Sequence, residues 1–274
     1  MLIDTHCHIN FKDFKEDADE VIKKSLENGV QLICVGVEYE TSQRAVEYAN
    51  KYDEGVWVAV GLHPMYVKSN HKIESIKHKE EIFNYEKYLE LAKNKKVVAI
   101  GEIGLDYHHF DDNSNLQMNA SVKEIKKKQK DVLQEFIKLA NEVKKPLVLH
   151  CWDAYDDLLK ILKKNSVKKC GVVHSFVGSW KTAQKFINLG YKIGLNGIIT
   201  YSESYDKLIK NIDLKNILIE TDCPYLSPKP LERDSRNEPE NVKYIAQKIA
   251  EVKEIKIDEV EKVTTINAKK LFRI

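Results

Sequence analysis

The sequence has no long apolar run and no excess of charge of one sign, and each absence excludes a class of protein. No apolar run approaches the roughly 18 residues that a membrane-spanning helix needs. The first residues enter a patterned strand, so we also expect no signal peptide. The 44 basic and 42 acidic residues leave a net charge of +2. Any contact with nucleic acid therefore has to come from a local site and not from an overall basic surface.

Cysteine is scarce, and the motifs of nucleotide-binding loops are missing. The five cysteines are odd in number and include no Cys-x-x-Cys pair, which predicts free thiols in a reducing cytosol. We therefore expect a cytoplasmic protein, or a nuclear one if the source is eukaryotic. Neither GxGxxG nor GxxxxGK[ST] occurs, so we expect no nucleotide cofactor. No feature of the sequence favours an oligomer over a monomer.

Short apolar runs alternate with longer amphipathic segments rich in Lys and Glu. Helical periodicity follows each apolar run, for example over 81–93 and 122–143. No linker rich in Gly, Pro or Ser divides the chain, so we expect one domain over residues 1–274. Eight strand–helix units favour the α/β class, and within it a closed (β/α)8 TIM barrel over an open doubly wound sheet. The predicted strands are 2–9, 31–36, 56–61, 96–101, 146–150, 170–174, 191–195 and 216–220.

Two polar segments interrupt this pattern, and a basic run lies within the helix predicted over 122–143. Residues 66–80 are expected to form a loop, and 108–121 is long for a connection between strand and helix, which indicates a lid or a disordered insertion. The basic run 123–130 is open to two interpretations, a localisation or nucleic-acid patch and the solvated face of a long helix, and we favour the second.

The first strand ends in a His-x-His pair. Residues two apart on a strand point to the same face, so His6 and His8 aim two imidazoles at one point, where they can share a cation. Cys7, between them, has to point the other way and is expected to pack in the core. The alternative for the two histidines is a solvated strand end.

The same kind of side chain recurs at the ends of other predicted strands. Parallel strands of a barrel bring their carboxyl ends to one rim, where such barrels carry their catalytic groups. Singly, each residue could be a structural histidine or a capping acid. Their recurrence at the carboxyl ends of several predicted strands favours a metal site. The additional donors are His63, Glu102, His150, His174 and Asp222, whereas His71, His78, His108 and His109 lie in polar stretches.

The number of donors favours two divalent ions. The six donors other than His63 are too many for one four-coordinate zinc ion that keeps an open position. We expect Glu102 to bridge the ions, with His6, His8 and Asp222 completing one site and His150 and His174 the other. Imidazole with carboxylate suits zinc or manganese better than calcium; zinc is the ion we expect to find bound, with magnesium or manganese as alternatives in function.

Such a centre predicts hydrolysis by an activated water. Two ions about 3.5–4 Å apart clamp a phosphoryl oxygen and lower the pKa of water to about 7. Asp222 and Glu102 are the predicted catalytic residues, with Asp222 as the general base that accepts the proton of the water. His63, which precedes Pro64, is expected to contact a substrate phosphate and not to be a further ligand.

Several neighbours of these residues have two interpretations. Asp106 and Glu220 could orient the histidines or cap the next helices. Trp152 and Tyr225 could stack on a base or pack at the rim. Asp4 is expected to be a structural acid near the strand.

Taken together, the motifs resemble those of the TatD-type metal-dependent deoxyribonucleases, within the amidohydrolase-like barrels. The resemblance implies a divalent metal centre, a DNA substrate and phosphodiester hydrolysis, often as a 3′-to-5′ exonuclease. It also implies that His6, His8, Glu102, His150, His174 and Asp222 are metal ligands and that His63 lies at the substrate phosphate. It rests on 4–8, 61–64, 101–107, 146–150, 173–176, 220–226 and 236–239.

The chain departs from the family at three positions, and its polar insertion over 108–121 is longer than is usual in the family. Lys128 and Trp152 stand where members often carry Arg, and Ser175 where Cys is frequent. Loss of these arginines weakens bidentate phosphate contacts, so the substrate preference can differ from that of the family.

Two other functions compete with a nuclease. One is a metal-dependent amidase, lactonase or aminoacyl-ester hydrolase, acting for instance on aminoacyl-tRNA. Many such barrels bridge their metals with a carboxylated lysine after strand four, and a glutamate there favours the nuclease. The other is a protein that binds metal or nucleic acid without catalysis, against which the intact set of donors argues.

Overall fold

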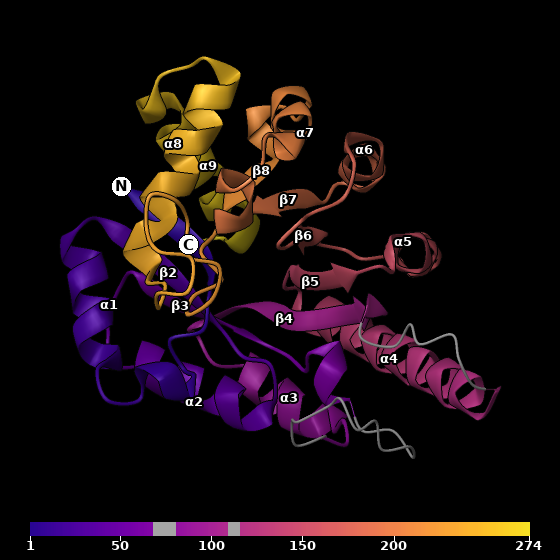
Figure 1. Ribbon diagram of the computed structural model, residues 1–274. Helices are drawn as coiled ribbons and strands as arrows, with labels where there is room; N and C mark the ends of the chain where they lie inside the picture. Colours follow the sequence, from indigo (N-terminus) through magenta and orange to yellow (C-terminus); the bar gives the residue numbers. More distant parts are fainter. Residues whose placement is uncertain (68–80, 109–115) are drawn as a thin grey trace.

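Eight parallel strands form a sheet in which strands adjacent in sequence are also adjacent in space (Figure 1). The structure, a computed structural model, describes residues 1–67, 81–108 and 116–274, and of 116–121 only the backbone. The strands are β1 (Leu2–Cys7), β2 (Val30–Val35), β3 (Val56–Val60), β4 (Val97–Asp106), β5 (Leu147–Trp152), β6 (Gly171–Val173), β7 (Lys192–Leu195) and β8 (Ile217–Ile219).

The sheet curls into a nearly closed barrel. Ladder pairing runs from β1 to β8, and in the described part of the chain no ladder joins β8 back to β1. Hydrogen bonds just beyond β8 make this connection instead: Asp222 N donates to His6 O and His8 N donates to Cys223 O, both at 2.8 Å. The predicted α/β barrel is therefore confirmed, with its last seam formed by loop residues.

Helices surround the strands (Figure 1), and none of the described helices is long and apolar enough to cross a membrane. Short 3-10 turns are interspersed with them. The α-helices are α1 (Ala18–Glu27), α2 (Tyr39–Ala49), α3 (Tyr85–Ala92), α4 (Leu116–Val143), α5 (Tyr155–Lys164), α6 (Trp180–Asn188), α7 (Asp206–Asn211), α8 (Val242–Lys253) and α9 (Ile257–Phe272).

The core has two layers, one inside the barrel and one between sheet and helices. A contact cluster that takes side chains from seven different strands can form only inside the barrel; it includes Ile3, Ile33, Val148 and Leu218, with Phe272 of α9. The second, larger cluster joins the outer face of the strands to the helices. The interior of the barrel is thus filled with apolar side chains, which confines polar chemistry to its mouth.

Several predicted boundaries were wrong. β1 ends at Cys7 and not at residue 9, so His8 follows this strand. β4 continues to Asp106, so Glu102 lies within this strand and not after it. α3 begins at Tyr85 instead of residue 81, because the Asn84 side chain caps the helix by accepting a hydrogen bond from Lys87 N at 3.1 Å. α4 begins at Leu116, so the end of the predicted 108–121 insertion is helical. The rest of that insertion, 109–115, and most of the predicted 66–80 loop, 68–80, lie outside the described residues.

The basic run on α4 is a helix surface with acidic partners. Lys130 Nζ lies 2.6 Å from the carboxylate of Asp157 on α5, and Lys127 pairs with Asp131 on its own helix at the same distance. The hydrogen bond from Lys130 lowers the pKa of Asp157 to about 2. The solvated helix face, favoured above, accounts for these lysines.

Candidate metal centre

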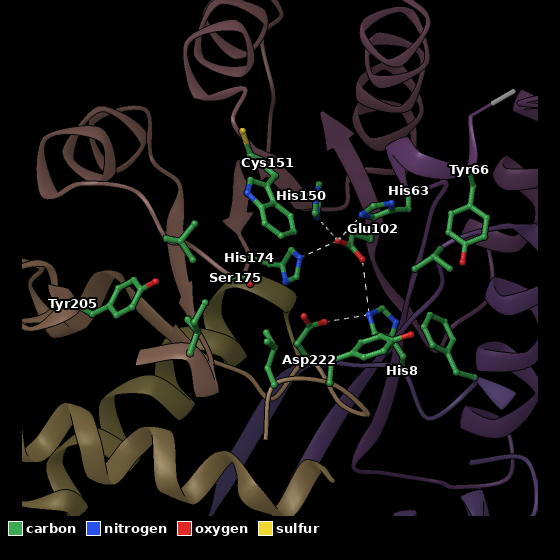
Figure 2. Close-up of a pocket in the computed structure, with 17 residues that line it drawn as sticks. His8, His63, Tyr66, Glu102, His150, Cys151, His174, Ser175, Tyr205 and Asp222 are labelled. Atoms are coloured by element: carbon green, nitrogen blue, oxygen red, sulfur yellow. Dashed lines mark hydrogen bonds and ion pairs between the residues drawn. The ribbon is translucent and has the colours of Figure 1, made fainter. Parts of the chain in front are cut away.

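The mouth of the barrel gathers the histidines and carboxylates that the sequence places at strand ends, and Figure 2 shows them apart from His6. Six of the eight strands contribute, each through its carboxyl-terminal half or the residues that follow it. The donors are His6 in β1, His8 just after β1, His63 after β3, Glu102 in β4, His150 in β5, His174 after β6 and Asp222 after β8.

Glu102 lies at the centre of the group, as Figure 2 shows. Its Oε1 is 2.8 Å from His174 Nε2, 3.0 Å from His150 Nδ1 and 3.5 Å from His63 Nε2. Its Oε2 is 3.4 Å from His6 Nε2 and 3.9 Å from His8 Nε2. One carboxylate, 3% exposed, therefore meets five imidazoles with its two oxygens.

Asp222 faces the histidines of β1. Its Oδ1 lies 3.3 Å from His8 Nε2 and 3.6 Å from His6 Nε2, and these two ring nitrogens are 3.2 Å apart. Three groups of donors, each with ligand atoms within 4.8 Å of one another, result from this packing: His6 with His8 and Asp222, His6 with Glu102 and His174, and His63 with Glu102 and His150.

Contacts on the far side of the rings fix which nitrogen faces the centre. His8 Nδ1 is 2.8 Å from Val35 O, and a carbonyl only accepts, so in the neutral ring Nδ1 carries the proton and Nε2 presents its lone pair. His150 Nε2 likewise contacts Asp106 Oδ2 at 3.0 Å, and His174 Nδ1 lies 3.4 Å from Glu220 Oε1. Asp106 and Glu220 therefore contact histidines, the first of the two interpretations given above. Metal-binding histidines are typically oriented in this way.

Burial and charge oppose each other in the pKa values of this group. Burial disfavours the charged form of Glu102, but the electrostatic effect of the surrounding imidazoles, His174 foremost, outweighs burial and holds its pKa well below the usual range. Burial likewise disfavours ionisation of Asp222, and the hydrogen bond from His8 outweighs it, so that its pKa is lowered. Both carboxylates are therefore ionised at neutral pH.

The donor set fits divalent cations. Two ionised carboxylates lie among imidazole nitrogens, and His6 and His8 turn nitrogens toward each other. The far ring nitrogens of His8 and His150 are held by a backbone and a carboxylate oxygen. His6 Nδ1 is buried and has no hydrogen-bond partner in the described part of the chain. Mixed nitrogen and carboxylate donors around one point are the ligands that zinc and manganese take.

His63 differs from the other histidines. Met65 N donates a hydrogen bond to its Nδ1 at 3.2 Å, so in the neutral ring the proton is on Nε2, the atom that faces Glu102. Burial, together with the charge of His150, lowers its pKa to about 3, which keeps the ring neutral. The atom turned toward the centre is therefore a hydrogen-bond donor and not a lone pair.

Two glycines, which the sequence analysis did not single out, allow the carboxylates their positions. A Cβ on Gly61 would lie 2.5 Å from the carbonyl carbon of Gly101 and 2.8 Å from Glu102 N, so the chain after β3 runs directly against the Glu102 backbone. A Cβ on Gly194 in β7 would lie 2.5 Å from Glu220 Oε2. Any other residue at either position would displace the group beside it.

The loop that carries Asp222 is anchored from both ends of the chain. Asp4 accepts hydrogen bonds from Thr221 N at 2.9 Å and Thr221 Oγ1 at 2.5 Å, which confirms its structural role. Asn237 Nδ2 donates to Thr221 O and to Tyr225 O, at 3.2 and 2.8 Å. The side chain of Asp222 is thus presented by a fixed backbone.

A cavity of about 510 Å³ opens above the donors. Trp152 and Tyr225 line it, and Cys7 is buried away from it. Hydrophobic periodicity does not mark the other apolar lining residues, because they lie on the connections between helices and strands. These are Phe11, Val37, Tyr66, Val177, Ile198, Tyr205 and Leu226.

Comparisons with known proteins match the chain over its whole length. The family model described as TatD related DNase matches residues 3–273. An uncharacterised metal-dependent hydrolase of Bacillus subtilis strain 168, YabD, is 38% identical over 278 residues, which cover 100% of both chains. The crystal structure of YJJV, a TatD homologue from Escherichia coli K12, has a TM-score of 0.80 and 30% identity, covering 100% of this chain and 98% of that one. A TatD-family hydrolase from Entamoeba histolytica also has a TM-score of 0.80, at 25% identity, with 99% and 97% covered.

Proposed function

Since this chain belongs to the family of TatD-related DNases and is a metal-dependent hydrolase, we propose that it hydrolyses phosphodiester bonds of DNA with two divalent ions in one catalytic domain, residues 1–274. The observation that carries the proposal is the position of Glu102, whose two oxygens face different sets of imidazoles. A carboxylate in this position suits a bridge between two cations.

The ligands divide between the two ions by the contacts described above. Glu102 would bridge them, His6, His8 and Asp222 would hold one ion, and His150 and His174 the other. We expect zinc on isolation, with magnesium or manganese as ions that support turnover. When bound, the ions would neutralise charge on the phosphoryl oxygens and make water a nucleophile at neutral pH.

Asp222 would act as the general base. In the described part of the chain its carboxylate contacts two imidazoles through Oδ1, which leaves Oδ2 to take a proton from the attacking water. Its lowered pKa keeps it ionised and ready to accept that proton. His63, with its proton on Nε2, would donate a hydrogen bond to a phosphoryl oxygen of the substrate. This supports a substrate contact for His63 over a place among the ligands.

The resemblance to the family is what supports 3′-to-5′ exonuclease action, because the described mouth has no feature that by itself sets polarity. The presence of a glutamate in β4, instead of a lysine that could be carboxylated, favours the nuclease over an amidase, lactonase or aminoacyl-ester hydrolase.

The test is digestion of single-stranded DNA labelled at its 3′ end by the purified protein, with and without EDTA, beside an ester and an amide substrate. We expect release of the terminal nucleotide that EDTA abolishes and that Asp222→Asn reduces by at least 100-fold without loss of fold. Strong esterase or amidase turnover with no EDTA-sensitive DNA cleavage would reject the nuclease in favour of the other hydrolases.

A further inference from the structure

Large apolar side chains at the surface concentrate around the cavity. Seven such side chains are exposed among the described residues, and three of them, Trp152, Val177 and Tyr225, line this one cavity. Exposed apolar area gathered in a concave site indicates a ligand that covers it.

Trp152 is held in place before any ligand arrives. It ends β5, two residues after His150, and its indole is 40% exposed. The ring of His108 stacks on it, with centroids 4.2 Å apart and an interplanar angle of 13°. Asp153 in turn holds His108, through a contact of 2.8 Å between Oδ2 and Nδ1. A ring fixed on one side loses little conformational freedom when a ligand stacks on it.

Apart from the donors, the described lining of the cavity that contains Trp152 is largely apolar and uncharged. Val177, Ile198, Tyr205 and Leu226 also line it, and Figure 2 shows Tyr205 and Tyr66 on opposite sides of the donor cluster. Among the described lining residues, the charged side chains are the donors themselves, and there is no Lys or Arg. A second phosphate would find no cation here, whereas a flat, neutral ring would find a stacking partner.

We propose that Trp152 is the stacking platform for the nucleobase next to the scissile phosphodiester bond, a specificity-determining contact that rests on the proposed function. Every base has an aromatic face, so this contact selects for a nucleoside beside the bond without selecting its sequence. Tyr225 is the weaker candidate, because it is 54% exposed and its ring meets Phe11 only edge-on, at 6.4 Å.

Two small substrates isolate this contact. Thymidine 5′-(p-nitrophenyl phosphate) and methyl p-nitrophenyl phosphate release the same leaving group, so the ratio of their kcat/KM values reports the nucleoside alone. For the wild type we expect a ratio of about 5 to 150, which corresponds to the roughly 1–3 kcal/mol that stacking contributes per base. Trp152→Ala should reduce the ratio to within about threefold of one, and Trp152→Phe should retain most of it.

Tyr225→Ala is the matched aromatic control and should keep the wild-type ratio. A ratio unchanged in Trp152→Ala, or one lost in Tyr225→Ala instead, overturns the proposal. The wild type supplies a second measurement that needs no variant: the p-nitrophenyl phosphate of an abasic deoxyribose should react like the methyl ester, and a rate equal to that of the thymidine ester refutes stacking. Absence of EDTA-sensitive turnover of all three diesters rejects the phosphodiesterase function itself, and the stacking role with it.

Discussion

Replacement of Glu102 by Gln tests the centre at its most connected residue. The change keeps the shape of the side chain, removes its negative charge and places an amide N–H₂ group against imidazole nitrogens that lie 2.8 to 3.9 Å from the carboxylate. Water cannot take the place of the lost negative charge beside the five imidazoles, because the side chain is only 3% exposed.

The size of the effect follows from this burial. Breaking a buried charge pair costs about 3–5 kcal/mol, and each 1.4 kcal/mol is a factor of ten in a binding constant. The dissociation constant of at least one ion should therefore rise by about 10²- to 4 × 10³-fold. After dialysis against a mild chelator, elemental analysis should find two ions per chain in the wild type and at most one in Glu102→Gln. DNA turnover should fall by at least 100-fold.

Glu81→Gln is the matched control for this experiment. The Glu81 carboxylate is partly buried and accepts hydrogen bonds from Tyr39 N at 2.8 Å and Tyr88 Oη at 3.0 Å, so it has a similar polar environment away from the donors. It should retain both ions and full turnover. A folded Glu102→Gln protein that holds two ions and digests DNA within about threefold of the wild type would refute the bridging role.

Three further predictions concern the support of the site and the surface. Gly194→Ala should displace Glu220 and weaken metal binding by about 10- to 100-fold in a metal titration; an unchanged titration contradicts this. Asn237→Ala removes the four hydrogen bonds of this side chain and should cost about 1–3 kcal/mol in urea unfolding, with lower turnover because Asp222 loses its anchor; unaltered unfolding and turnover would count against it. Because the pKa of Asp157 is lowered on folding, its ion pair stabilises above pH 4 and is lost toward pH 2. Asp157→Asn should therefore cost about 1 kcal/mol at pH 7 and little at pH 2.5, and a pH-independent difference argues otherwise.

The positions of the donors could be predicted because they depend on strand ends, which the hydrophobic pattern marks. His6, His8, His150 and His174 each follow or end an apolar run, and parallel strands bring such ends to one rim. The position of Glu102 in the middle of β4 could not be predicted, because the apolar pattern is as compatible with a strand that stops at Gly101 as with one that continues to Asp106.

The residues that line the cavity could not be predicted from hydrophobic periodicity, for another reason. Phe11, Tyr66 and Tyr205 lie on connections whose course is set by tertiary contacts and not by periodicity. The alternatives left open for Asp106 and Glu220 also needed coordinates, since an acid after a strand can equally cap a helix or orient a histidine. The donor side chains that meet at the barrel mouth could thus be predicted from the sequence, whereas the cavity lining and the contacts of Asp106 and Glu220 required the structure.

The seam between the first and last strands has a consequence for how the protein can fail. The amide of Asp222 bonds the carbonyl of His6, and the amide of His8 bonds the carbonyl of Cys223. The bonds that finish the ring of strands are thus made by the donors themselves or by their immediate neighbours. Transient opening of the barrel between β1 and β8 would therefore also separate the donor side chains. The exchange of these two amide protons with solvent would report on the fraction of molecules in which the donors are assembled.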